Sequence, residues 1–152
     1  MILSIIRLTR IYYTLPLSLG LAVIAMYVRA GQIADIAGKL IAAVGALFCI
    51  LNAAYAFNDI IDVEIDRINC PQRVLACGKL SIKTAFAVCI VFVVAGLALA
   101  TIGGLWFYIS LDITACMLLL YDMFSKKLGA FKPFAVGFIT TMIYPKIGRA
   151  HV

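Results

Sequence analysis

Four of the seven acidic residues in this 152-residue chain lie in one short segment that follows a long apolar run. The oxygen-bearing side chains at its start are Asn58, Asp59, Asp62 and Asp66. If the arriving helix continues through them, Asn58, Asp62 and Asp66 lie four residues apart on one face, with Asp59 one step round. Carboxylates beside an apolar membrane segment are costly and repel one another. This face therefore needs a cation to bridge it.

Such a face favours a hard divalent cation. Mg²⁺ binds one or two carboxylates, keeps several waters and takes phosphate oxygens as its other ligands. Cations that could hold a phosphate or diphosphate from the other side follow at Arg67, Arg73 and Lys79. A simpler alternative is an acidic helix end that pairs with its own arginines at the level of the lipid headgroups.

The pattern Asn58-Asp59-x-x-Asp62-x-x-x-Asp66, followed by Asn69-x-Pro71-x-Arg73 and Gly78, resembles the first aspartate-rich motif of the UbiA superfamily of intramembrane prenyltransferases. Val74 stands where that family commonly has proline. The stretch Glu64–Pro71 is similar to the branch that includes digeranylgeranylglyceryl phosphate synthases and chlorophyll synthases. The resemblance implies that the motif helps to bind Mg²⁺ and the diphosphate of a polyprenyl donor.

The resemblance also implies a role for individual residues. The expected metal ligands are Asn58, Asp59, Asp62 and Asp66. Asp62 and Asp66 are the expected catalytic residues among them. The expected diphosphate contacts are Asn58, Arg73 and Lys126. The last belongs to a Tyr121-x-x-x-x-Lys126 pattern that resembles a tyrosine-lysine signature of the family, although Asp122 stands in place of the usual serine.

Composition places these residues in a membrane protein. The chain is 65% hydrophobic and 13% charged, whereas charged residues make up about a quarter of a soluble domain. Its net charge of +6 is not accompanied by aromatic-basic interleaving, so we expect no nucleic-acid partner. The five cysteines form no Cys-x-x-Cys pair, and we expect neither a disulfide nor a metal site from them.

The expected fold is an all-α transmembrane bundle with four spans and part of a fifth. A basic interfacial lead-in is predicted over residues 1–10. The predicted spans are Ile11–Val28, Leu40–Phe57, Thr84–Ile102 and Leu105–Tyr121. A cationic loop with Lys126, Lys127 and Lys132 is expected next, and then Phe134–Pro145, which is too short to cross.

Small and polar residues inside these spans have their own predicted roles. Ala42 and Ala46 would let a neighbouring helix approach closely. Asn52 shares the face of Asp59 and is expected mainly to hydrogen-bond between helices. Asp112 is expected either to be a neutral, hydrogen-bonded carboxyl or to face a substrate cavity.

The domain is expected to cover residues 1–145, as the N-terminal part of one prenyltransferase domain. By resemblance, such enzymes carry a second aspartate motif later in the chain. Residues 146–152 do not continue the last helix and resemble the read-through translation of a sequencing adapter, so we expect a non-native tail with no role for His151.

Basic residues predict the orientation in the membrane. Nine of the eleven lysines and arginines before residue 146 fall on the side of the aspartate segment, against Arg29 and Lys39 on the other. Because cytoplasmic loops are enriched in lysine and arginine, we expect an integral protein of the cell membrane with this segment in the cytoplasm.

The expected function is Mg²⁺-dependent transfer of a polyprenyl group from its diphosphate to a small-molecule or lipid acceptor within the membrane. The chain alone is expected to be inactive. Two other classes stay open: a cation transporter that uses the acidic face as an ion path, and a noncatalytic membrane fragment. Arg67 and Arg73 beside the acidic face count against a passing cation.

Overall fold

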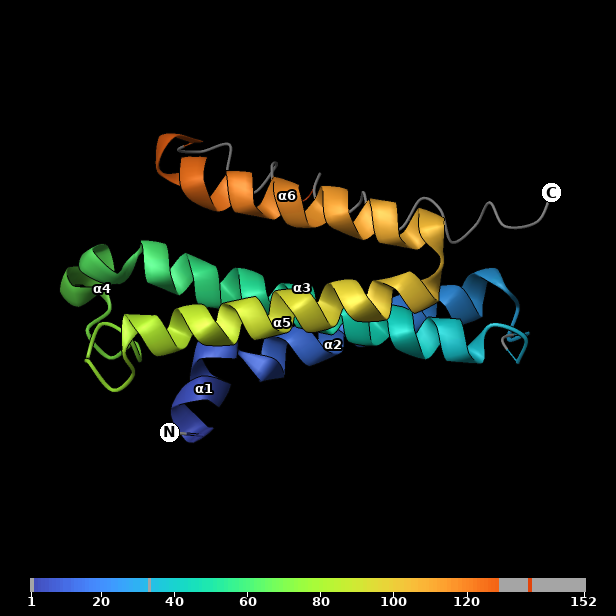
Figure 1. The fold of residues 1–152 in the computed structure, drawn as a ribbon, viewed down its shortest axis with the longest axis horizontal. Helices are drawn as coiled ribbons and strands as arrows, with labels where there is room; N and C mark the ends of the chain where they lie inside the picture. The colour runs from blue at the N-terminus through green and yellow to red at the C-terminus, as the bar shows by residue number, and fades with distance from the viewer. Residues whose placement is uncertain (1, 33, 129–136, 138–152) are drawn as a thin grey trace.

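The computed structural model of the protein describes residues 2–32, 34–128 and 137. These residues form helices and no strand, in agreement with the predicted all-α fold (Figure 1). The helices are α1 (Ile2–Thr9), α2 (Ile11–Val28), α3 (Ala37–Ile61), α4 (Val63–Asn69), α5 (Ile82–Gly103) and α6 (Leu105–Leu128).

Three of these helices, α2, α3 and α5, are long and apolar enough to cross a membrane. The predicted first span coincides with α2, while α3 and α5 extend the second and third predicted spans at both ends. Helix α6 begins at the predicted residue and has an apolar stretch over Leu105–Leu120. The predicted fifth span and the tail, 134–145 and 146–152, lie outside the described residues apart from position 137.

The predicted start of the cationic loop is wrong. Helix α6 continues to Leu128, so Lys126 and Lys127 lie on its last turn and not in a loop. Lysine is a good helix former, and a helix that leaves the apolar region can continue through it without losing backbone hydrogen bonds. The hydropathy of the chain marks the end of the apolar stretch but not the end of the helix.

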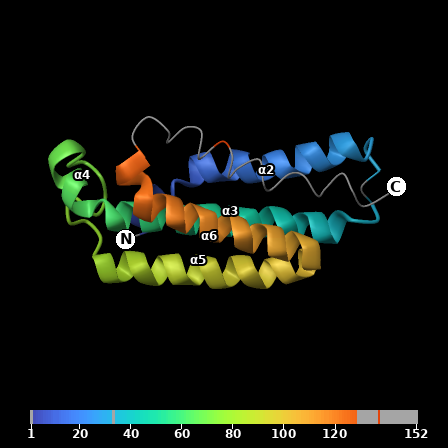
Figure 2. The ribbon, with the colours of Figure 1, turned by 90° about the horizontal axis from the view of Figure 1, so that it is seen from above.

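Helix α3 is the centre of the bundle. It contacts α1, α2, α5 and α6, and it lies between α2 and α5 when the bundle is seen from above (Figure 2). Its contact with α5 is close: a Cβ atom on Gly96 would lie 3.0 Å from the Ile50 side chain and 3.2 Å from the Cβ of Cys49. Small residues of this kind let two helices approach within the membrane. Ala42 and Ala46 are likewise buried, as their spacing predicts.

A buried polar contact fixes α2 against α3. The Thr14 hydroxyl donates a hydrogen bond to Oδ1 of Asn52 at 3.3 Å, and the Asn52 amide donates to the carbonyl of Phe48 at 2.6 Å. Both Thr14 and Asn52 are fully buried. The prediction that Asn52 hydrogen-bonds between helices is confirmed.

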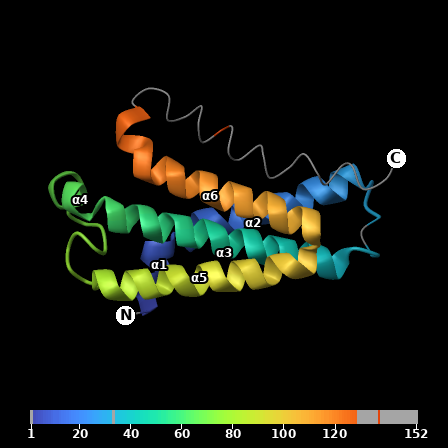
Figure 3. The same ribbon diagram turned by 45° about the horizontal axis from the view of Figure 1, so that its top comes forward.

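The two ends of the bundle differ in the elements and charged residues that they contain. The α1–α2 corner, α4, the start of α5 and the last turns of α6 lie toward one end, and the α2–α3 connection lies at the other (Figures 1 and 3). At that other end, Arg29 pairs with Asp35. The first end therefore holds the aspartate segment together with the N-terminal arginines.

Candidate diphosphate site

The aspartate segment forms two helices with a break of one residue. Helix α3 ends at Ile61, Asp62 has φ −92° and ψ 4°, and α4 begins at Val63. Backbone hydrogen bonds bridge the break, from the Asp62 amide to the Asn58 carbonyl at 3.0 Å and from the Asp66 amide to the Asp62 carbonyl at 2.8 Å. The segment is therefore two helices and not one regular helix.

One face of this segment is turned into the bundle. Asp59, Val63 and Asp66 are buried, whereas Asn58 and Asp62 are half-buried. Asp59, which was expected one step round from the other acids, shares the inner face with Asp66, because the two are seven residues apart, close to two helical turns. The site is organised around this pair.

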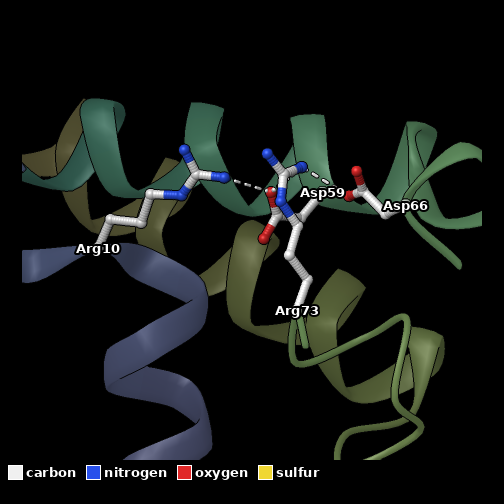
Figure 4. A network of polar contacts seen from close by, with 4 residues as sticks. All are labelled: Arg10, Asp59, Asp66 and Arg73. Carbon is white, nitrogen blue, oxygen red and sulfur yellow. Dashed lines mark hydrogen bonds and ion pairs between the residues drawn. The ribbon is translucent and has the colours of Figure 1, made fainter. Parts of the chain in front are cut away.

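Two arginines hold the pair. Nη2 of Arg10 lies 2.8 Å from Oδ1 of Asp59, and Nη1 of Arg73 lies 2.6 Å from Oδ2 of Asp66 (Figure 4). Nη1 of Arg73 is also 3.4 Å from Oδ1 of Asp59. Figure 4 shows Arg73 between the two carboxylates and Arg10 on the far side of Asp59. This is the pairing of acids with their own arginines that the sequence left open as the simpler alternative.

The loop after α4 brings Arg73 back over the carboxylates. Helix α4 ends at Asn69, the Arg73 amide donates to the carbonyl of the next residue, Cys70, at 3.0 Å, and Gly78 turns the chain with φ 72°. The loop is anchored because Val74 and Leu75 are buried in the same apolar cluster as Val63. The residue that departs from the family pattern, Val74, is thus a core residue here.

Charge keeps Arg73 protonated. Burial opposes the charged form of its guanidinium, but the hydrogen bond to Asp66 and the nearby negative charges of Asp59 and Asp66 outweigh that effect. The pKa of Arg73 is therefore raised above its usual value. It remains a permanent cation beside the two acids.

Arg10 is the site residue that sequence reasoning missed. It lies at the corner between α1 and α2 in the left-handed conformation, with φ 51° and ψ 45°. Its guanidinium carbon is also 5.1 Å from the centre of the Tyr55 ring, within the range of a cation–π contact. A basic residue in an interfacial lead-in predicts contact with headgroups, and no local spacing reveals a partner 49 residues away.

Two of the predicted cations take no part in this network. Arg67 and Lys79 are exposed. Lys126 lies on the last turn of α6, where the structure describes the backbone alone. Asp112 is exposed on α6 and makes no hydrogen bond with another described residue, so its predicted neutral, hydrogen-bonded form finds no partner in this part of the chain.

The carboxylate oxygens of this site are the kind of ligand that Mg²⁺ prefers, but they supply only part of its coordination shell. Among the described residues no group of three or more His, Cys, Asp or Glu side chains could hold a metal ion. Asp59 and Asp66 each accept from an arginine through one carboxylate oxygen, and their other oxygens accept no hydrogen bond from the described side chains. Two carboxylates are what Mg²⁺ takes from a protein when phosphate and water complete its shell.

The fold and the site are those of an integral membrane protein made of helices, with two buried acids paired to arginines at one end of the bundle. Sequence comparison identifies the family. Residues 18–150 match the UbiA prenyltransferase family, and the chain belongs to that family.

Relatives of known name agree with this assignment. The digeranylgeranylglyceryl phosphate synthase of Saccharolobus solfataricus is 30% identical over 139 residues, which is 91% of this chain and 49% of the relative. That of Sulfurisphaera tokodaii is 32% identical over 110 residues, or 72% of this chain and 40% of the relative. A solved structure concerned with digeranylgeranylglyceryl phosphate synthase in membranes superposes with a TM-score of 0.84 at 26% identity, over 93% of this chain and 50% of that one. The chain spans about half the length of the proteins it matches.

The pairing of Arg73 with Asp66 predicts how the loop responds to neutralisation of that acid. Asp66→Asn removes the charge from the shorter of the two Arg73 contacts, so the loop after α4 should open more often. The half-buried Cys70 should then react several-fold faster with a maleimide, measured by mass spectrometry of the peptide that contains it. Glu64→Gln, an exposed acid on the same helix, is the matched control. Equal rates in both variants would show that the ion pair does not hold the loop.

Proposed function

We propose that this chain supplies one side of the active site of a Mg²⁺-dependent prenyltransferase. The enzyme moves a polyprenyl group from an allylic polyprenyl diphosphate to a small-molecule or lipid acceptor inside the membrane. The observation that carries this proposal is the pair of buried acids, Asp59 and Asp66, held beside two guanidinium groups in a segment that belongs to a prenyltransferase family.

Each group has a part in this proposal. Asp59 and Asp66 would bind Mg²⁺ together with Asn58 and Asp62, with Asp62 and Asp66 essential to turnover. When bound, Mg²⁺ neutralises charge that builds on the departing diphosphate and so eases cleavage of the allylic carbon–oxygen bond. Arg73, with Asn58 and Lys126, would donate hydrogen bonds to the diphosphate oxygens.

The acceptor is proposed from the relatives. Their name describes a product in which two geranylgeranyl groups are joined to glyceryl phosphate. An isoprenoid glyceryl phosphate that already carries one such group is therefore the acceptor that we favour. The apolar surfaces of α2, α5 and α6 would keep both isoprenoid chains in a water-poor environment.

The geometry does not favour a cation path. Both inner acids are already paired with arginines at 2.8 Å and 2.6 Å, and a permanent cation at each acid would repel a passing ion. Paired acids suit a ligand that brings its own negative charge, because an arginine can turn to that ligand while a metal ion takes its place.

Neutralising the proposed metal ligands should abolish transfer. In a protein that joins this chain to the second half that its relatives have, Asp62→Asn and Asp66→Asn should each lower the rate of Mg²⁺-dependent prenyl transfer by roughly 100-fold or more, since a carboxamide lacks the charge that a hard cation needs. The assay follows diphosphate release from geranylgeranyl diphosphate in lipid vesicles. Glu64→Gln is the control, and this chain alone should release none. Normal turnover in either aspartate variant contradicts the proposed roles.

We also propose that the aspartate segment faces the cytoplasm, because most basic residues of the chain belong to that side. Cys77 is exposed beside this segment and reports on it directly. A membrane-impermeant thiol reagent should label Cys77 in broken cells but not in intact ones. A Tyr27→Cys variant provides the control, because Tyr27 is exposed near the opposite end of α2. Labelling of Cys77 in intact cells would contradict this orientation and place the segment on the outer side of the membrane.

A further inference from the structure

Arg10 makes two contacts with one face of α3. Its guanidinium lies 2.8 Å from Asp59 and 5.1 Å from the centre of the Tyr55 ring. Tyr55 and Asp59 are four residues apart, so they are neighbours on the same side of the helix. The positive charge of Arg10 is thus stabilised by the Asp59 carboxylate and by the Tyr55 ring together. These contacts fix the α1–α2 corner to the start of the aspartate segment.

The backbone at Arg10 is adapted to this task. A residue other than glycine with φ 51° adopts a strained conformation that persists where its surroundings hold it. The preceding Leu8 and Thr9 are fully buried. The Arg10 carbonyl accepts hydrogen bonds from the amides of Tyr13 at 2.8 Å and Thr14 at 3.2 Å. Arg10 is held on its backbone as well as on its side chain.

The two arginines are not equivalent partners of Asp59. Both contact the same oxygen, Oδ1, but Arg10 does so at 2.8 Å and Arg73 at 3.4 Å. The short contact of Arg73 is with Asp66, at 2.6 Å. The Arg73 side chain is also the more exposed, 31% against 23% for Arg10. Asp59 therefore has one close, enclosed partner and one distant partner on a loop.

This asymmetry has an electrostatic consequence. A buried carboxylate that loses its counter-ion is strongly destabilising. If Arg73 leaves the acids for another anion, Asp59 keeps Arg10 and stays neutralised. Asp66 loses its arginine and gains a free oxygen for another cation. Arg10 makes it possible for Arg73 to leave without an unpaired charge at Asp59.

We propose that Arg10 is a positioning residue that holds Asp59 as its resident counter-ion and leaves Arg73 as the exchangeable cation that turns to an incoming diphosphate. The first part concerns the chain alone. The second part rests on the proposed function, and separate measurements test the two.

Double-mutant cycles test the resident pair. Thermal unfolding of the chain in detergent would be followed for Arg10→Gln, Arg73→Gln and Asp59→Asn, alone and combined. Arg10→Gln should lower the Tm by roughly 5 °C or more, and most of that loss should vanish in the Asp59→Asn background. The exposed Arg7 and Arg67 lie on α1 and α4, and their glutamine variants are the matched controls.

Two results would contradict the role of Arg10 as the counter-ion of Asp59. If Arg73 couples to Asp59 more strongly than Arg10 does, or if Arg10→Gln behaves like Arg7→Gln, Arg10 is not the resident counter-ion. Tyr55 adds a check: Tyr55→Phe keeps the aromatic face and should keep the Tm, whereas Tyr55→Leu should lower it.

Inorganic pyrophosphate with Mg²⁺ tests the exchangeable cation. In the protein completed with its second half, this pair of ligands should raise the Tm of the wild type and of Arg10→Lys, which keeps the charge. The rise should be lost in Arg73→Gln and kept in Arg67→Gln. A rise that survives Arg73→Gln but not Arg10→Lys reverses the two roles. No rise in the wild type refutes the exchange and the proposed diphosphate site, while the cycles still decide the role of Arg10.

Discussion

A carboxylate buried at the end of a membrane helix must be neutralised where it lies, and this requirement shapes one whole end of the bundle. Asp59 and Asp66 are nearly fully buried, and their partners come from 49 residues earlier and 7 residues later in the chain. Satisfying the two acids ties together the α1–α2 corner, the end of α3, α4 and the loop before α5. Each of these elements contributes one member of the charge network: Arg10 from the corner, Asp59 from α3, Asp66 from α4 and Arg73 from the loop.

The apolar middle of the bundle is held by different forces. There α3 meets α5 at Gly96, whose missing side chain leaves room for Ile50 and Cys49 of α3, and meets α2 through the hydrogen bond between Thr14 and Asn52. Shape and buried polar contacts between uncharged groups set these helix positions. The ion pairs can therefore change partners at one end while the helices stay in place, as a site that exchanges an arginine for a metal ion would require.

Local pattern predicted the helices better than the site. The apolar run Ile11–Val28 predicts both ends of α2 correctly, because the hydropathy of the run and the length of a membrane-spanning helix agree there. The inner face was harder, since stacking of residues four apart favoured Asn58 and Asp62 as neighbours of Asp66. Asp59 and Asp66 are seven residues apart and also share a face of a helix, and only the packing of the bundle decides which face is buried. Arg10 could not be found at all, because its conformation and its partner depend on how α1 folds back against α3. The end of α6 was missed because lysine ends an apolar stretch without ending a helix.

The network of Arg10, Asp59, Arg73 and Asp66 organises this end of the bundle, and guanidinium NMR can test whether it forms. With arginine labelled with ¹⁵N and the chain in lipid nanodiscs, a guanidinium that is held by a carboxylate rotates slowly about its Cζ–Nε bond, whereas one in water rotates fast. Arginine-to-lysine variants assign each signal. We expect slow rotation for Arg10 and Arg73 and fast rotation for the exposed Arg7 and Arg67. Fast rotation of Arg10 and Arg73 would show that the two acids are not held as described, and the account would fail.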